Sequence, residues 1–220
     1  MRRLLIILSL ILLVGCNNSK TLPKPESLVD DVFSVDKNIN MNTIDNYLNL
    51  PDVVYRDVRM LFDPANFADI GGDADLSSTI EGFKIVPYPY IASLQALPVS
   101  NAYNGNTLFE VKWNDDGKID SLKPLYEESY IVIEELFPKD KKIFLMCGGG
   151  GYANMMKEVL IHIGYDKDKI YNIGANWTYK GKHKKELIIY PEDVNGNKIY
   201  ASWRADYAYI PFEKMHKLKY

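Results

Sequence analysis

Cysteine and histidine are scarce in this chain of 220 residues, which holds two cysteines and three histidines. Cys16 and Cys147 lie far apart, and neither has another cysteine or a histidine at metal-ligand spacing. The sequence therefore predicts neither a disulfide scaffold nor a bound metal. Basic residues are not in excess, because 26 Lys and Arg stand against 29 Asp and Glu, a net charge of −3. This balance excludes the basic surface that a nucleic-acid partner would need.

The chain also lacks a hydrophobic run long enough to span a membrane. The run from Leu4 to Val14 has eleven residues, including Ser9. A transmembrane helix needs about 20 apolar residues. The composition is otherwise that of a folded protein, since 47% of the residues are hydrophobic and 12% are aromatic. Such a chain can bury a sizeable core, so disorder is excluded as a description of the whole.

The first 16 residues have the charge and hydropathy pattern of a secretory leader. Arg2 and Arg3 precede the apolar run, whose length suits the core of a signal peptide. The run ends in Leu13-Val14-Gly15-Cys16, which resembles the lipobox of bacterial lipoprotein precursors. The resemblance implies cleavage before Cys16, lipid attachment to Cys16 and a protein anchored on the extracytoplasmic face of the cell membrane. The alternative is an ordinary secretory signal in which Cys16 is incidental.

Composition divides the rest of the chain into parts. Residues 17–27 are polar, contain Pro23 and Pro25 and show no apolar period, which is typical of an extended tether. Asn195-Gly196 near the other end is a hairpin-turn signal. The expected parts are a signal peptide over 1–15, a lipid-anchored tether and N-terminal extension over 16–41, a main domain over 42–185 and a C-terminal β-hairpin extension over 186–220.

An apolar strand, a helix and a second apolar strand follow one another in the second half of the chain. Residues 142–146 suit a buried strand, a helix is expected over 153–163, and residues 169–173 form the next strand. This spacing makes a βαβ unit, so we predict an α/β fold with a small parallel sheet flanked by helices. The other expected elements are strands over 53–58 and 84–88, helices over 42–48 and 122–136, and added β-hairpins over 107–121 and 187–203.

Cys147 stands between the expected strand and the expected helix, followed by four consecutive glycines. Glycines let the backbone adopt conformations that turn several amide hydrogens toward one atom. These amides and the positive end of the helix dipole are expected to stabilise an anion at the sulfur and to lower the thiol pKa. A thiolate is a nucleophile, so the position favours covalent catalysis. The alternative is that Cys147 is a small hydrophobic residue packed in a turn.

The order of motifs around Cys147 resembles the rhodanese-like family. Tyr55-Arg56-Asp57-Val58-Arg59 is similar to the first family signature, and Ile80-Glu81-Gly82-Phe83 is similar to the Ile-x-Gly-Ala segment. Residues 155–177 resemble the family's helix, strand and glycine-containing turn with a nearby tryptophan. The resemblance covers roughly residues 42–180 and implies a rhodanese-like three-layer α/β fold.

The resemblance also implies a reaction. Cys147 would be the catalytic nucleophile that takes a sulfane sulfur from a donor, becomes a persulfide and passes the sulfur to a thiol acceptor. No cofactor is implied. The backbone amides that would hold the terminal sulfur belong to Gly148, Gly149, Gly150, Gly151 and Tyr152.

Two loop positions depart from the family pattern. Active family loops carry a basic residue directly after the cysteine and a basic or polar residue five after it, where this chain has Gly148 and Tyr152. The departure weakens the case for an anionic donor such as thiosulfate, since a charge-assisted hydrogen bond contributes about 1.5–3 kcal/mol. A catalytically inactive binding or scaffold lipoprotein on the same fold therefore stays open as the alternative. Asp57 and Arg59 are expected to order the end of the sheet.

Other interpretations fail on particular residues. A cysteine phosphatase needs an arginine that closes its phosphate loop, and none occurs between Cys147 and Arg204. The glycines lack the Lys-Ser or Lys-Thr of a Walker loop and the acidic residue that would hold a nucleotide ribose. His162 and His183 are expected in a helix and in a solvated loop, not beside Cys147. The sixteen tyrosines fit either a carbohydrate or peptide surface or half-buried sheet positions.

Overall fold

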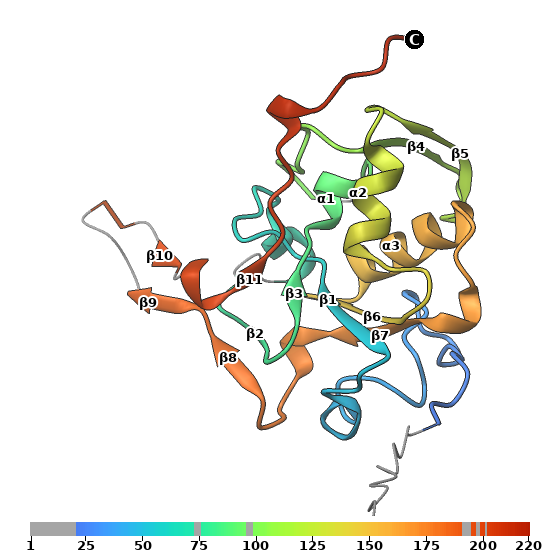
Figure 1. Ribbon diagram of the computed structural model, residues 1–220. Coiled ribbons are helices and arrows are strands. Elements are labelled where there is room, and N and C mark those ends of the chain that lie inside the picture. The colour runs from blue at the N-terminus through green and yellow to red at the C-terminus, as the bar shows by residue number, and fades with distance from the viewer. Residues whose placement is uncertain (1–20, 73–75, 96–98, 191–194, 197–198, 201) are drawn as a thin grey trace, which may run out of the picture.

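The structure is a computed structural model that describes residues 21–220 except 73–75, 96–98, 191–194, 197–198 and 201 (Figure 1). The signal peptide expected over 1–15 and the expected lipidation site Cys16 lie outside the described residues. Within the described ranges, no helix combines the length and the hydropathy that crossing a membrane requires.

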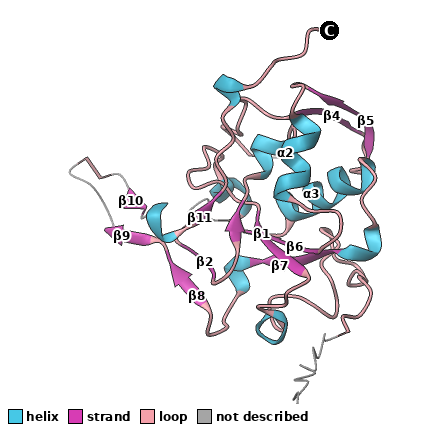
Figure 2. Cartoon of the chain, viewed as in Figure 1, coloured by secondary structure: helices cyan, strands magenta, loops and turns pink. Residues whose placement is uncertain are grey.

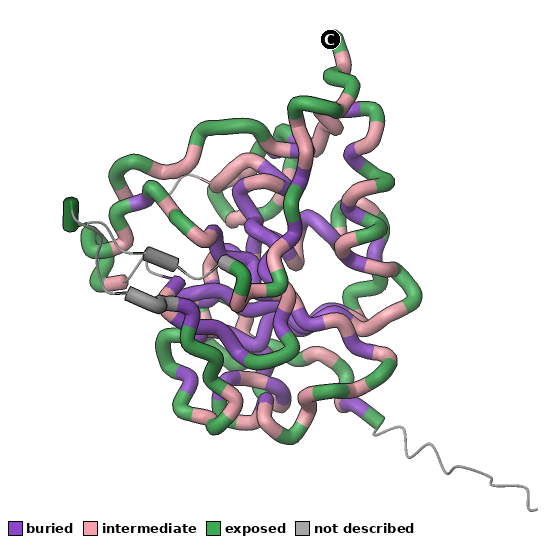
Figure 3. Tube along the Cα trace, turned by 60° about the vertical axis from the view of Figure 1, so that its left-hand side comes forward, coloured by how far each residue is buried: buried purple, intermediate pink, exposed green. Residues whose placement is uncertain are grey.

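A parallel sheet of five strands forms the centre of the fold, in the order β11-β3-β1-β6-β7. In Figure 1 the strands run through the middle of the molecule, and Figure 3 shows that this part of the chain is mostly buried. The strands of the sheet are β1 (Val53–Asp57), β3 (Lys84–Ile85), β6 (Lys142–Cys147), β7 (Ile170–Ala175) and β11 (Asp206–Tyr207).

Three α-helices lie on one face of this sheet (Figure 2). They are α1 (Tyr88–Ile91), α2 (Ser129–Leu136) and α3 (Gly151–His162). Residues 21–50 cover much of the opposite face, where they pack with residues of β1, β6 and β7. The 3-10 helices are η1 (Ile44–Tyr47), η2 (Phe67–Ile70), η3 (Lys167–Lys169), η4 (Asn176–Thr178), η5 (Ser202–Arg204) and η6 (Phe212–Lys214).

Strand β6 explains why both faces are covered. Ile143, Leu145 and Cys147 pack toward the helices, while Phe144 and Met146 pack toward the N-terminal segment. Successive side chains of a strand point to opposite faces, so a continuous apolar run requires a covering layer on each side. The apolar run seen in the sequence is therefore a strand at the centre of the core.

The short antiparallel pairs lie outside the main sheet. Two of them were expected as hairpins, over 107–121 and 187–203, and both are confirmed. The third joins segments more than 100 residues apart and was not expected. The pairs are β4 (Phe109–Trp113) with β5 (Ile119–Pro124), β9 (Ile188–Tyr190) with β10 (Ile199–Tyr200), and β2 (Ser78–Ile80) with β8 (Lys184–Glu186).

The α/β class, the parallel sheet flanked by helices, the added hairpins and the βαβ unit are confirmed. The helix expected over 122–136 is wrong in its first half, because residues 122–124 belong to β5 and pair with β4. The helix begins only at Ser129, whose hydroxyl donates to the carbonyl of Leu108 at 2.9 Å. The helix expected over 42–48 is a single 3-10 turn, η1.

The described part of the N-terminal segment packs against the domain, in contrast to the extended tether expected over 17–27. Leu22 is buried, and the hydroxyl of Tyr171 donates to the carbonyl of Pro23 at 2.7 Å. The buried carboxylate of Asp36 accepts hydrogen bonds from the backbone amides of Glu26, Asn38 and Ile39 at 2.7–2.9 Å. From residue 21 onward, the segment is therefore part of the folded body.

The C-terminal extension expected over 186–220 is more than a hairpin. Strand β11 adds to the edge of the main sheet, where Tyr207 pairs with Ile85 of β3. Ala208 and Ile210 then enter the main core. Residues after the β9–β10 hairpin are therefore integral to the central fold.

Candidate functional site

Cys147 is the last residue of β6, which lies between β1 and β7. In a parallel sheet the carboxyl ends of neighbouring strands meet at one edge, and this edge commonly carries the ligand site. Met146 pairs with Asp57 at the end of β1, and Cys147 pairs with Ala175 at the end of β7. The structure therefore gathers Cys147, Asp57 and the residues that follow β7 at one edge of the sheet.

The glycine loop, defined here as residues 148–151, connects Cys147 to α3. Gly150 has φ +104°, a left-handed conformation that other residues rarely adopt. In this conformation the backbone N–H of Gly150 donates a hydrogen bond to Sγ of Cys147 at 3.0 Å. The backbone N–H of Ala153 in the first turn of α3 also stabilises the thiolate. One amide of the glycine loop, that of Gly150, and one amide of α3, that of Ala153, therefore stabilise the sulfur, and only Gly150 is among the residues expected to do so.

Two aromatic side chains cover the glycine loop. A Cβ atom at Gly148 would lie 2.5 Å from Cζ2 of Trp177, so the indole occupies the space of any side chain at position 148. A Cβ atom at Gly150 would lie 3.2 Å from the Phe33 side chain of the N-terminal segment. Trp177 thus explains why glycine stands where the family pattern has a basic residue, because a longer side chain would have to displace the indole.

Tyr152, the other position that departs from the family pattern, is fixed by the protein itself. Its hydroxyl donates to Oδ2 of Asp63 at 2.9 Å, and its ring packs against the rings of Tyr88 and Phe67. Burial raises the pKa of Asp63, and burial together with Asp63 raises the pKa of Tyr152. The side chain of Tyr152 therefore anchors the start of α3 and its hydroxyl points to Asp63 rather than serving as a cationic clamp.

The electrostatic balance at Cys147 contradicts the expected lowering of its pKa. The side chain is only 3% exposed, and this burial raises the pKa of the thiol above its ordinary value. The amides of Ala153 and Gly150 favour the thiolate, Asp57 opposes it and Arg59 favours it, but the loss of solvation is the largest effect. The expectation was wrong because the sequence shows the glycines but not the side chains that shield the sulfur from water. Cys147 therefore rests as a neutral thiol at neutral pH.

Asp57 and Arg59 form a buried ion pair beside the site. The guanidinium donates to both carboxylate oxygens of Asp57, at 2.9 and 2.6 Å, and to the carbonyl of Ser78 at 2.7 Å. The hydroxyl of Thr79 donates to Oδ2 of Asp57 at 2.8 Å. These contacts tie the end of β1 to β2, which matches the ordering role expected for the pair.

Asn172 is a further site residue that the sequence analysis missed. It is fully buried in β7, and its Nδ2 donates to the carbonyl of Phe33 at 2.7 Å and to that of Gly150 at 3.3 Å. Its Oδ1 accepts from the amide of Gly174 at 3.0 Å. One side chain thus fixes both the glycine loop and the segment that covers it. The sequence signal that could have identified Asn172 is that it is the one polar side chain in the apolar run 170–173.

The histidines are not brought to Cys147. His162 is the last residue of α3, roughly 16 Å along the helix axis from Gly151 at a rise of about 1.5 Å per residue. His183 lies in the segment before β8, where its backbone amide donates to the hydroxyl of Tyr179 at 3.0 Å. Across the described parts of the chain, no group of three His, Cys, Asp or Glu side chains is arranged to hold a metal ion.

Comparison with known proteins found no relative of this chain. No family model matches the chain, and neither the curated proteins nor the solved structures provide a match. The functional conclusion therefore rests on the sequence motifs and on where the fold places them.

Proposed function

We propose that the chain is a rhodanese-like sulfurtransferase or sulfur carrier that forms a persulfide on Cys147. The observation that carries the proposal is the hydrogen bond of 3.0 Å from the Gly150 amide to Sγ of Cys147. It occurs in a loop between a central parallel strand and a helix, which is also the place of the rhodanese-like motif. An amide that contacts the thiol sulfur is suitably placed to stabilise negative charge when the sulfur reacts.

The reaction is a pair of sulfur transfers that needs no oxidant. Cys147 loses its proton, and the thiolate attacks the outer sulfur of a donor persulfide R–S–SH. The new S–S bond gives Cys147–S–SH, and the donor leaves as the thiolate RS⁻, which takes up a proton. An acceptor thiolate then attacks the outer sulfur, forms its own persulfide and releases the Cys147 thiolate. Amides of the glycine loop hold the sulfur that carries the charge in each step.

The proposed donor is an organic persulfide or a polysulfide rather than thiosulfate. Trp177 occupies the space at position 148, and Tyr152 is tied to Asp63, so neither departing position supplies a cation. The guanidinium of Arg59 is already bound to the carboxylate of Asp57. A dianionic donor would thus lack the charge-assisted hydrogen bonds that contribute about 1.5–3 kcal/mol each.

Access to Cys147 requires its cover to move. The Trp177 and Phe33 side chains that cover the glycine loop are 42% and 40% exposed, so each has an open side toward solvent. An outward swing of either ring would uncover loop amides without breaking the sheet. Admission of water would at the same time remove part of the desolvation that raises the Cys147 pKa. Opening and activation of the thiol are therefore proposed to occur together.

The proposed location is the extracytoplasmic face of the cell membrane, with the lipid on Cys16. The support is the lipobox-like sequence ending in Cys16 and the polar residues 17–20 that follow it. Expression in a bacterium with an alkyne-tagged fatty acid tests this location. Label is expected on the wild-type chain and on Cys147→Ser, and label on Cys16→Ser would contradict attachment at Cys16.

The second candidate is a catalytically inactive binding or scaffold lipoprotein. Two observations favour it, namely the 3% exposure of Cys147 and the raised pKa of its thiol. On this alternative Cys147 is a packing residue, and the fold serves to display a surface.

Intact-mass spectrometry separates the two candidates. The full chain is incubated with an organic persulfide, with polysulfide and with thiosulfate, and mass gains of one sulfur atom are recorded. An adduct on Cys16→Ser that is absent from Cys147→Ser is expected, with persulfide loading faster than thiosulfate. The absence of an adduct from all donors, in a chain with normal circular dichroism, would reject the sulfurtransferase and favour the scaffold.

A further inference from the structure

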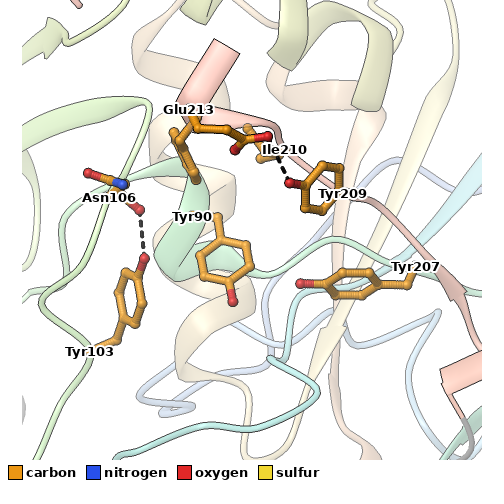
Figure 4. A pocket seen from close by; sticks show the side chains of 8 residues that line it. Tyr90, Tyr103, Asn106, Tyr207, Tyr209, Ile210 and Glu213 are labelled. Carbon is orange, nitrogen blue, oxygen red and sulfur yellow. Dashed lines mark hydrogen bonds between the residues drawn. The ribbon is translucent and has the colours of Figure 1, made fainter. Parts of the chain in front are cut away.

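A hollow that we call the tyrosine pocket is lined by no residue of the glycine loop and has a volume of about 360 Å³ (Figure 4). This volume is within the range of about 300–1,000 Å³ that is typical of small-molecule sites. The side chains that matter for its chemistry are Tyr90, Tyr103, Tyr207, Tyr209, Phe212 and Glu213.

Segments that are distant in the sequence meet to form the tyrosine pocket. Tyr90 belongs to α1, which follows β3, and Tyr207 belongs to β11, which pairs in parallel with β3. Tyr209 and Glu213 follow β11. The pocket therefore lies at the carboxyl edge of the sheet, the edge that commonly carries ligands in α/β folds. Its position depends on β11, the strand that the sequence did not predict.

Aromatic rings surround the hollow on several sides (Figure 4). The ring centroids of Tyr90 and Tyr103 lie 5.4 Å apart, and those of Tyr90 and Phe212 lie 6.2 Å apart. Both pairs are edge-to-face, so the rings point in different directions around the space. Aromatic rings carry negative charge density on their faces, and a cage of differently oriented rings is the usual receptor for an organic cation.

Two of the four tyrosine hydroxyls that line the tyrosine pocket are hydrogen-bonded within the protein. Tyr103 donates to the carbonyl of Asn106 at 2.8 Å, and Tyr209 donates to Oε1 of Glu213 at 3.0 Å. Burial raises the pKa of Tyr103 to about 12, so this phenol stays neutral at physiological pH. Burial and then the neighbouring Tyr90 raise the pKa of Tyr207, so its phenol also stays neutral. A carbohydrate needs many hydrogen-bonding partners, and the engagement of the Tyr103 and Tyr209 hydroxyls leaves fewer of them free, whereas a cation held by ring faces needs none.

The charge of the pocket has one sign. Among the described side chains that line it, Glu213 is the one that carries a charge, and it is acidic. The geometry points to a binding site for a small organic cation with a quaternary or methylated ammonium group, with the rings around the methyl groups and Glu213 as the counter-ion. Such a ligand needs no hydrogen-bond acceptor, which agrees with the engagement of the Tyr103 and Tyr209 hydroxyls. The inference does not depend on the reactivity of Cys147.

Choline and its neutral isostere 3,3-dimethyl-1-butanol test the proposal directly. Isothermal titration of the full chain in a non-ionic detergent is expected to show choline binding, with the isostere at least about tenfold weaker, because the neutral compound loses the cation–π attraction to several rings. Tyr209→Ala and Glu213→Gln should each weaken choline binding by roughly threefold to tenfold. Tyr209→Phe keeps the ring and should bind close to the wild-type level.

Substitutions outside the tyrosine pocket serve as matched controls. Tyr220→Ala removes an exposed ring, and Glu110→Gln removes an exposed carboxylate, both outside the pocket, so neither should change choline binding. Cys147→Ser should also leave it unchanged. Equal affinity for choline and the isostere, binding of N-acetylglucosamine in place of choline, or no heat with choline at millimolar concentration would each overturn the proposal.

Discussion

Gly148→Ala tests the packing of Trp177 over the glycine loop. The new Cβ would lie 2.5 Å from Cζ2 and 2.6 Å from Cε2 of Trp177, whereas ordinary carbon contacts lie at about 3.5–4.0 Å. The indole must therefore move by about 1 Å. Gly148 does not have a left-handed φ, so the substitution causes no backbone strain there and its effect reports the clash.

The expected cost follows from the exposure of the indole. Overpacking a core costs about 1–3 kcal/mol, and a side chain that is 42% exposed can swing outward instead of straining the sheet. We expect Gly148→Ala to lower the free energy of unfolding by about 1 kcal/mol. Because the indole covers the glycine loop directly after Cys147, its displacement should also make alkylation of Cys147 faster.

A double-mutant cycle with Trp177→Ala isolates the contact. In the double variant the alanine at position 148 no longer meets an indole. The loss of unfolding free energy in the double variant should therefore be about 1 kcal/mol smaller than the sum of the losses in the two single variants. Urea unfolding followed by circular dichroism measures each variant. Gly151→Ala is the matched control, because its Cβ would meet Phe33 at an ordinary 3.4 Å and alanine favours a helix. Additive losses, or a Gly148→Ala chain as stable as the wild type, would refute the reasoning.

Three further predictions concern the thiol and its supports. Because burial raises the Cys147 pKa, the pH midpoint of iodoacetamide alkylation should lie above the ordinary thiol value of about 8.5, and Trp177→Ala should bring it down; a midpoint below 8 in the wild type would contradict this. Arg59→Leu should cost about 3–5 kcal/mol in urea unfolding, since it leaves the Asp57 carboxylate buried without its cation, and Asp57→Asn in the same chain should recover part of the loss. Asn172→Ala should speed amide hydrogen exchange in residues 28–36 without affecting the β4–β5 hairpin, because it removes the hydrogen bonds to Phe33 and Gly150; unchanged exchange would show that the side chain does not hold the covering segment.

Local patterns predicted the central unit of the fold. The apolar run before Cys147, the glycines after it and the apolar strand beyond the helix describe β6, α3 and β7 with boundaries within three residues. Turn signals such as Asn195-Gly196 also predicted two hairpins, because the two strands of a hairpin are close in the sequence. Cys147 at the carboxyl end of a parallel strand follows from these elements.

Long-range contacts account for what the sequence did not reveal. Strand β11 has two residues, and only its pairing with Lys84 and Ile85 makes it part of the sheet. The polar N-terminal segment hides its role because a single buried carboxylate, Asp36, organises it through backbone amides. The Cys147 pKa rises because the sulfur is buried, and the side chains that cover the adjoining glycine loop, Trp177 and Phe33, come from separate parts of the chain. Such contacts have no local signature.

Time-resolved peptide mapping of the protein after mixing with a ³⁴S-labelled persulfide donor tests the nucleophilic role of Cys147 most directly. The full chain is mixed with the donor and then with an acceptor thiol, and the label on the peptide that contains Cys147 is followed by mass spectrometry. We predict that the label appears on Cys147 before it appears on the acceptor, and that it leaves Cys147 as fast as the acceptor gains it. Label that reaches the acceptor at the same rate with Cys147→Ser, or that never appears on Cys147, would contradict the account.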